Sequence, residues 1–150
     1  MYHSIDDEKV KVFLTRIVNR CMTESDEIIG SNPIEKRIKL AELNIEQVLE
    51  ALADDWCVEV RIKVARNPNT TVSVLERLAK DKDWQVRYEV AENPSTPAGV
   101  LKILADDENW NVRYLVAENP NTPISVLERL AKDKERIIRR AVAKRKKKLK

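Results

Sequence analysis

Arginine and aspartate recur at a fixed interval along the chain, and their charges are the first features that could do chemistry. Arginine stands at four positions spaced 26 residues apart, Arg61, Arg87, Arg113 and Arg139. Aspartate keeps the same interval at Asp55, Asp81, Asp107 and Asp133. A row of guanidinium groups could bind an anionic ligand, or each planar fork could hold oxygens of an adjacent repeat. Because residues that specify stacking recur while ligand contacts vary, we favour the contact between repeats.

Two pairs of aromatic residues share the same interval. Trp84 and Tyr88 are four residues apart, and Trp110 and Tyr114 repeat the pair 26 residues later. On a helix both pairs face away from the repeated valines, which must reach a core. Aromatic and arginine side chains are favoured in binding hot spots. The candidate partner-binding patch is therefore Trp84, Tyr88, Trp110, Tyr114, Arg87 and Arg113, while stacking of the rings between repeats is the slightly favoured interpretation.

Catalytic, metal and cofactor sites find no support in the residue types. The chain has one histidine, His3, and two cysteines, Cys21 and Cys57, whereas a zinc site needs about four ligands. The acidic residues are numerous, but their spacing follows the repeat. We expect both cysteines to be reduced and buried, and we expect no catalytic residue, no metal and no cofactor.

These residues belong to an internal repeat. Three copies read VRIKVARNPNTTVSVLERLAKD, VRYEVAENPSTPAGVLKILADD and VRYLVAENPNTPISVLERLAKD. A weaker copy, IEKRIKLAELNIEQVLEALADD, precedes them, and there Ile34 and Ile38 are taken to replace the repeated valines. A partial copy starts near Ile138 and gives way to a basic tail. A period of this length indicates an array of similar structural units.

Each unit predicts two short helices. The first spans roughly residues 84–91 in the middle copy and must stop at Asn93, since a residue before proline is pushed out of the helical region. The second is predicted to start from an N-cap threonine at Thr70, Thr96 and Thr122, with proline at the first helical position of two copies. Its apolar residues form one buried stripe, which stacked neighbours can share.

The predicted fold class is therefore all-α, a solenoid of two-helix repeats around a shared core. An N-terminal helical cap is assigned to residues 1–33, with an amphipathic helix from Glu8 to Met22. The repeats cover 34–143, as a degenerate unit 34–55, clear units 56–81, 82–107 and 108–133, and a partial unit 134–143. Residues 144–150 are predicted to be a solvated basic tail.

The motif VRxxVAxNPxTPxxVLxxLAxD resembles the leucine-rich repeat variant, a bacterial repeat family similar in style to HEAT repeats. The resemblance covers about residues 48–143 and extends loosely back to Ile34. It implies a right-handed superhelix that alternates α-helices with short α- or 3₁₀-helices. A family member with an iron–sulfur cluster is known, but two cysteines cannot supply the four thiolates such a cluster usually needs.

Composition and charge restrict the function further. The 150 residues are 43% hydrophobic and contain only two glycines, which disfavours phosphate loops and dinucleotide-binding turns. The segment from Arg139 to Lys150 contains eight lysines and arginines and no acidic residue. Because the net charge of the chain is +3, residues 1–138 carry a net charge of −5. Neither a signal peptide nor a membrane span is evident, and we expect a cytoplasmic protein without membrane contact.

The chain is thus expected to be a non-enzymatic interaction module that binds a protein or peptide along a concave face. The repeats occupy most of its length and leave no room for a catalytic site. The alternative is a nucleic-acid-binding helical-repeat protein that uses the row of arginines and the basic tail.

Overall fold

The computed structural model describes residues 33–42 and 46–148, and every regular element in these two ranges is an α-helix. This confirms the all-α prediction for the described part of the chain. The second helix of each unit is α-helical there, without a 3₁₀ segment. The predicted cap, including the helix expected from Glu8 to Met22, lies outside the described residues.

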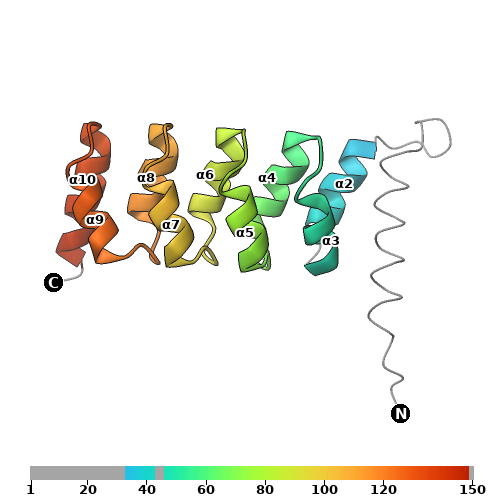
Figure 1. Cartoon of the computed structure of the whole chain (residues 1–150), viewed down its shortest axis with the longest axis horizontal. Helices are drawn as coiled ribbons and strands as arrows, with labels where there is room; N and C mark the ends of the chain where they lie inside the picture. Colours follow the sequence, from blue (N-terminus) through green and yellow to red (C-terminus); the bar gives the residue numbers. More distant parts are fainter. Residues whose placement is uncertain (1–32, 43–45, 149–150) are drawn as a thin grey trace, which may run out of the picture.

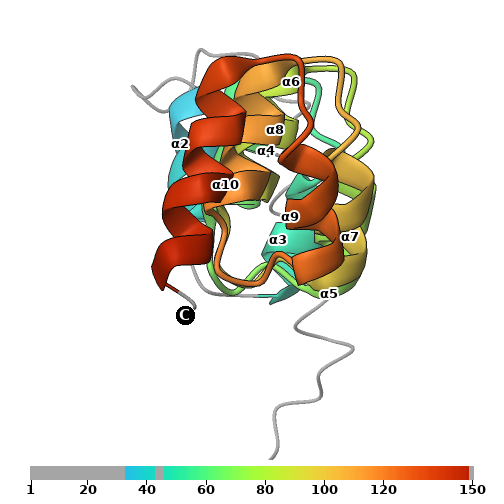
Figure 2. The same ribbon diagram turned by 90° about the vertical axis from the view of Figure 1, so that its left-hand side faces the viewer.

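The helices alternate between two layers. The first helices of the units, here called A helices, are α2 (Pro33–Ala41), α4 (Val58–Arg66), α6 (Trp84–Glu92), α8 (Trp110–Glu118) and α10 (Arg136–Lys148). The second helices, here called B helices, are α3 (Glu46–Leu52), α5 (Val72–Leu78), α7 (Ala98–Leu104) and α9 (Ile124–Leu130). The units follow one another along a single axis (Figure 1), and a view down that axis separates the A layer from the B layer (Figure 2). Successive A helices pack directly on one another, so the A layer is continuous.

The core lies between the two layers and runs through every unit. In α6, Val86 and Val90 are fully buried, and α7 contributes Val100, Leu101 and Leu104 at no more than 1% exposure. The same positions are buried in the units on either side. No short helix could bury such a stripe alone, so the stacking of neighbours supplies the stability.

The ends of the A helices follow the Asn-Pro prediction, whereas the predicted threonine caps are wrong. The helix α6 ends at Glu92 with Asn93 as its C-cap. The residue that caps α7 is Pro97, in extended conformation, and Thr96 stands one position earlier. The buried Thr96 hydroxyl donates to the Val90 carbonyl at 2.6 Å, so it satisfies the end of the preceding helix rather than the start of the next. Thr70 and Thr122 do the same.

The asparagine of each Asn-Pro pair ties one turn to the turn before it. Asn93 is 2% exposed, and its Nδ2 donates to the carbonyls of Ala65 and Asn67 at 2.7 and 2.9 Å. Its Oδ1 accepts the backbone N–H of Ser95 at 2.8 Å. Asn119 repeats these contacts one unit later. The asparagine therefore pairs backbone groups that would otherwise be buried without partners.

The first unit has a different register from the one predicted. Ile34 and Ile38 were expected at the buried valine positions, but both are only partly buried. Arg37 and Ala41 are buried instead, at 1% and 0% exposure. The segment RIKLA of α2 thus corresponds to RIKVA of α4, because the turn that follows is shorter in the first unit.

The predicted boundary of the basic tail at residue 144 falls inside a helix. The helix α10 continues to Lys148. Arg145 stands 26 residues after Asn119 and takes the role of the asparagine, since Nη1 donates to the carbonyls of Ala117, at 3.0 Å, and Asn119. Its Nη2 donates to the carbonyl of Pro120 at 2.8 Å. At least one cation of the predicted tail is therefore part of the repeat array.

Candidate interaction surface

The recurring arginines and aspartates form a ladder of ion pairs through the array. At each of three arginines, Nε and Nη2 donate to the two carboxylate oxygens of the aspartate 20 residues later, with Nε–Oδ2 distances of 2.6–2.7 Å (Arg61–Asp81, Arg87–Asp107, Arg113–Asp133). The Nη1 group donates to the carbonyl oxygen of the aspartate six residues earlier. Each inner aspartate therefore joins two successive rungs of this arginine ladder.

Burial and charge make these pairs strong. The Arg87 and Asp107 side chains are 10% and 5% exposed. The hydrogen bond to Asp107 raises the pKa of Arg87 above its ordinary value, against the effect of burial. For Asp133, burial raises the pKa, but hydrogen bonds from Arg113 and from the backbone of Glu135 hold it below its ordinary value. Bidentate charge-assisted pairing of this kind is among the stronger side-chain interactions.

The contacts support a structural role for the ladder in place of a row of free cations. The N–H groups of Arg87 that could bind a ligand carboxylate already face Asp107, Glu108 or a backbone carbonyl. Arg113 is occupied in the same way by Asp133 and its own turn. The two arginines predicted to flank the aromatic patch therefore belong to the interior of the array, and binding by this patch would rest on its rings.

The four aromatic residues of the predicted patch lie on α6 and α8, at the outer side of the A layer. Trp84 and Trp110 are 39% and 42% exposed, whereas Val86 and Val112 are fully buried. Tyr88 and Tyr114 are half-buried and pack against the core. The tryptophan rings are therefore partly open to solvent, and the tyrosine rings are partly covered by the core. We call these four residues the aromatic strip: Trp84, Tyr88, Trp110 and Tyr114.

One pair within the aromatic strip is fixed in a defined geometry. The rings of Trp84 and Tyr88 meet edge to face, with centroids 6.2 Å apart and planes at 90°. Burial raises the pKa of the Tyr88 phenol, and the neighbouring carboxylates of Glu92 and Glu89 raise it further. A tyrosine anchored on the core thus holds a half-exposed tryptophan, which reduces the entropy that the indole would lose on binding.

The strip is bounded by apolar side chains on one side and a cation on the other. Residues 58, 84, 110 and 136 each begin an A helix, so they form one row across the layer. In that row the half-buried Val58 precedes the two tryptophans, and the exposed Arg136 follows them. The surface therefore changes from apolar through aromatic to basic along the axis of the array.

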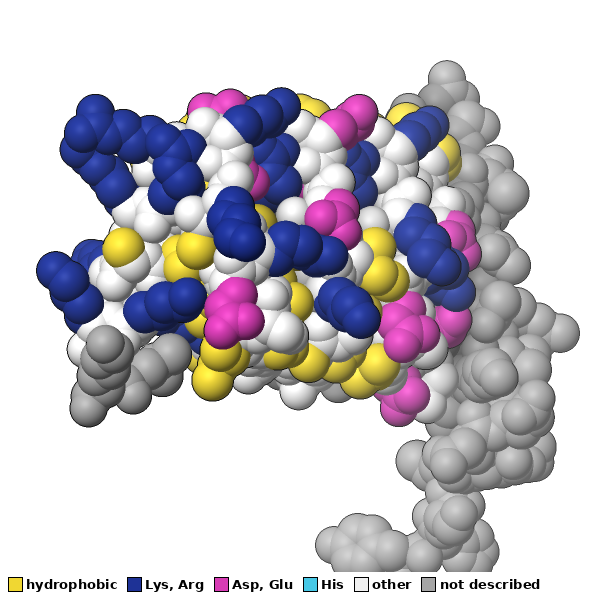
Figure 3. Space-filling view, turned by 60° about the vertical axis from the view of Figure 1, so that its left-hand side comes forward, with side chains coloured by type: hydrophobic (Ala, Val, Ile, Leu, Met, Phe, Trp, Pro, Cys, Tyr) yellow, Lys and Arg dark blue, Asp and Glu magenta, His cyan; other side chains and the backbone are white. Residues whose placement is uncertain are grey.

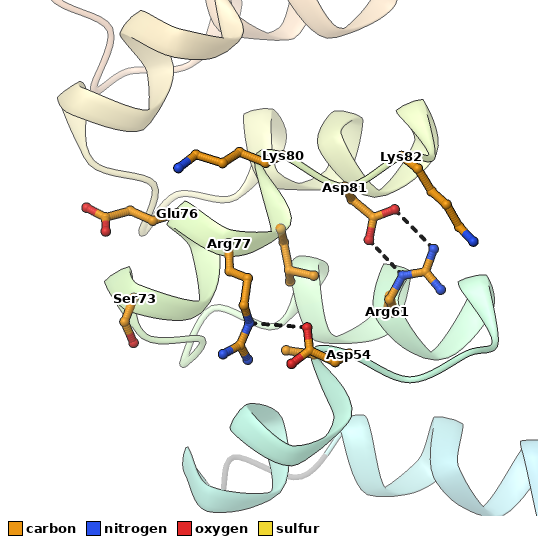
Figure 4. A pocket seen from close by; sticks show the side chains of 10 residues that line it. Asp54, Arg61, Ser73, Glu76, Arg77, Lys80, Asp81 and Lys82 are labelled. Carbon is orange, nitrogen blue, oxygen red and sulfur yellow. Dashed lines mark hydrogen bonds and ion pairs between the residues drawn. The ribbon is translucent and has the colours of Figure 1, made fainter.

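A groove on the B side of the array offers no chemistry of its own. It lies between the first and second units, and four of its charged side chains are paired, Arg61 with Asp81 and Arg77 with Asp54 (Figure 4). Arg77 also contacts Glu50 at 2.9 Å. Ser73 also lines this groove, and its hydroxyl forms a hydrogen bond with the hydroxyl of Thr71. In the described residues no three His, Cys, Asp or Glu side chains gather in a way that could hold a metal.

Comparison with known families agrees with this geometry. The family model described as leucine rich repeat variant matches residues 84–109 and 110–135, two adjacent units of the array. Residues 84–135 therefore match two leucine rich repeat variant repeats. No curated protein and no solved structure gives a significant match to the chain. The leucine rich repeat variant match covers the two units that carry the aromatic strip. None of the helices in the described ranges has the length and apolar character needed to cross a membrane.

Several contacts of the array were not foreseen from the motif. Arg66 of α4 holds the buried Glu89 of α6 through a bidentate pair of 2.5 and 2.9 Å. Trp56, which is 66% exposed, lies over Arg37, with the guanidinium carbon 5.0 Å from the ring centroid. None of these residues recurs at the repeat interval with the same type, so the repeat search gave no signal for them. Cys57 is buried with a free thiol, as expected, and Cys21 lies outside the described residues.

Proposed function

We propose that the array is a non-enzymatic interaction module and that the aromatic strip binds an extended peptide segment of a partner protein. The observation that carries this proposal is the exposure of Trp84 and Trp110, 39% and 42%, on adjacent helices of one rigid layer. Half-exposed tryptophans on a fixed scaffold are the type of side chain on which binding energy concentrates.

The spacing of the strip favours an extended peptide over a compact ligand. Neighbouring packed helices lie about 8–10 Å apart, so the two indoles repeat at about that distance. A polyproline II peptide advances about 9 Å in three residues and returns to the same face. A peptide with apolar residues three positions apart would therefore meet Trp84 and Trp110 in turn. Aromatic-lined grooves are known to recognise such peptides.

Selection from a random peptide library displayed on phage tests the proposal. We expect wild-type protein to enrich sequences with apolar residues three positions apart. Trp84→Ala and Trp110→Ala should each weaken binding of a selected peptide by about 2 kcal/mol, about thirtyfold. Ile124→Ala is the matched control, because Ile124 is 65% exposed on α9 in the B layer. Selected peptides that depend on Ile124 and not on the tryptophans would place the binding surface elsewhere.

The nucleic-acid alternative would have to rest on α10. Aspartate carboxylates already form ion pairs with Arg61, Arg87 and Arg113, so the arginine ladder does not support binding of nucleic acid. Titration of the protein with random duplex DNA at increasing salt separates the two functions. Sub-micromolar binding with a steep loss of affinity in salt would favour nucleic acid.

A further inference from the structure

The last arginine of the ladder is prepared for a carboxylate that the described residues do not provide. Nη1 of Arg139 donates to the carbonyls of Asp133 and Lys134 at 2.6 and 2.7 Å, the same backbone contact as in the inner rungs. Among the described residues no carboxylate lies within ion-pair distance of its Nε and Nη2. We call these two donors the Arg139 fork.

Exposure shows the same difference between the end of the array and its interior. Arg61, Arg87 and Arg113 are 6–9% exposed, whereas Arg139 is exposed. One turn further along the helix, the alanines of the inner units are completely buried (Ala65, Ala91, Ala117), whereas Ala143 is exposed. The guanidinium and the methyl group that inner units bury together are thus both open on α10.

The surroundings of the Arg139 fork are strongly basic. The helix α10 contains no acidic residue, and its exposed cations include Arg136, Arg140, Lys144 and Lys147. Figure 3 shows dark-blue side chains gathered at this end of the array, whereas acidic and basic side chains alternate over the B helices. An approaching acidic segment would be attracted before it makes contact.

We propose that this end of the array binds an acidic helical segment of a partner protein. Its aspartate or glutamate enters the Arg139 fork as Asp133 enters that of Arg113, and its apolar side covers Ala143. The three inner rungs already show this pairing within the array, with the carboxylate oxygen 2.6–2.7 Å from Nε. This site is separate from the aromatic strip and does not depend on its function.

The geometry favours a carboxylate on a helix over other occupants. In each inner rung the carboxylate comes from the third residue after a B helix, and that helix also packs on the A helix. A second copy stacked end to end would present Asp55, the equivalent aspartate of its first unit, but Asp55 already pairs with Arg37. Bidentate pairing with fixed backbone contacts also distinguishes the Arg139 fork from a lysine cluster that attracts any polyanion.

The test uses the full chain and a synthetic peptide that copies the helix and aspartate of the preceding rung. The peptide has the sequence of residues 122–135, TPISVLERLAKDKE, with blocked ends, and its control carries Asp133→Asn. Its three acidic and three basic residues give no net charge, so its binding reports the fork and not the general attraction of an acidic segment. Nitrogen-15 NMR follows the Arg side-chain Nε–H signals during titration to millimolar peptide. We expect a saturable shift of the Arg139 signal, and binding about tenfold or more weaker with the control peptide.

Two protein variants separate recognition by the fork from general attraction to a basic surface. Arg139→Lys keeps the charge but removes the fork, and we expect it to weaken peptide binding by about tenfold. Arg140→Ala removes an exposed cation of the same helix and should change the affinity by about twofold or less. Equal losses from the two variants, no saturable shift at millimolar peptide, or a preference for random duplex DNA over the peptide would each overturn the proposal.

Discussion

Nε of Arg37 lies 2.8 Å from Oδ2 of Asp55, with both side chains almost completely buried, and this pair is the first rung of the arginine ladder. The two residues are 18 positions apart, against 20 in the rungs that follow. The backbone N–H of Cys57 donates to Oδ1 of Asp55 at 2.8 Å, as Asp83 does to Asp81 one unit later. The first unit therefore keeps the ion pair although its arginine and aspartate are two positions closer in the sequence.

Removal of an inner rung is expected to destabilise the fold. Arg87→Ala leaves the buried carboxylate of Asp107 without its bidentate partner, and we expect a loss of about 1–3 kcal/mol in the free energy of unfolding. Urea denaturation measures this change. Arg140→Ala, an exposed cation of α10, is the control and should stay within about 0.5 kcal/mol of wild type. An unchanged midpoint for Arg87→Ala would show that the ladder does not hold the units together.

The ladder should also make stability depend on acid pH. The pKa of Asp133 is below its ordinary value of 3.8 in the fold. The folded state therefore binds fewer protons than the unfolded chain near that pH, so the stabilisation is present above the ordinary value and is lost as pH falls through the lowered one. Asp133→Asn should be less stable than wild type at neutral pH, and the difference should narrow between about pH 5 and about pH 2.

The matched control for this pH dependence is Asp106→Asn. Asp106 contacts Arg129 at 3.0 Å, but its side chain is 65% exposed. Its substitution should have a small effect at every pH, since solvent screens the pair. A gap between wild type and Asp133→Asn that stays constant on acidification would show that this carboxylate does not account for the dependence.

The asparagine of the turn is expected to be as important as the charged rungs. Asn93→Ala removes two buried donors and one acceptor, and leaves the carbonyls of Ala65 and Asn67 without these partners. We expect a loss of about 2–3 kcal/mol by chemical denaturation. Asn93→Asp should not rescue stability, because a carboxylate cannot donate to the two carbonyls. Asn69→Ala, at an exposed position of the neighbouring turn, should have little effect.

Arg145 should fix the end of α10. Arg145→Ala removes the donors to the carbonyls of Ala117, Asn119 and Pro120, and we expect faster amide hydrogen exchange in α10 together with a lower melting temperature. Lys144→Ala changes the adjacent, exposed cation and should leave exchange unchanged. If the two variants behaved alike, the basic residues would act only as a charged surface.

Tryptophan fluorescence tests the exposure on which the proposed function depends. Trp56, Trp84 and Trp110 are 66%, 39% and 42% exposed, so iodide should quench the native emission readily. Trp110→Ala should reduce the quenchable signal without a core-like loss of about 3–5 kcal/mol in stability. Blue-shifted emission that iodide does not quench would contradict an open aromatic strip.

The sequence by itself determined the repeat, the fold class and the position of the A helices in the three clear units, because these depend on local signals. Proline after Asn93 ends α6, and two valines one helical turn apart define its buried side, as they do in the other two clear copies. The opposed placement of Trp84 and Val86 also followed from the helical period alone. The same reasoning favoured contacts between repeats for the arginines, since a contact that recurs needs residues that recur.

The tertiary structure decided which groups meet across units, since those contacts depend on how one turn lies against the next. Thr96 was expected to cap α7, but its burial against α6 directs the hydroxyl back to Val90. The repeat search missed Arg37 because it stands two positions away from the 26-residue interval, and only its burial shows its place in the ladder. It missed Arg145 because an arginine stands there in place of the repeated asparagine. Arg87 was predicted to flank a binding surface, yet its three donor groups face Asp107 and the preceding turn because a buried guanidinium needs every partner it can reach.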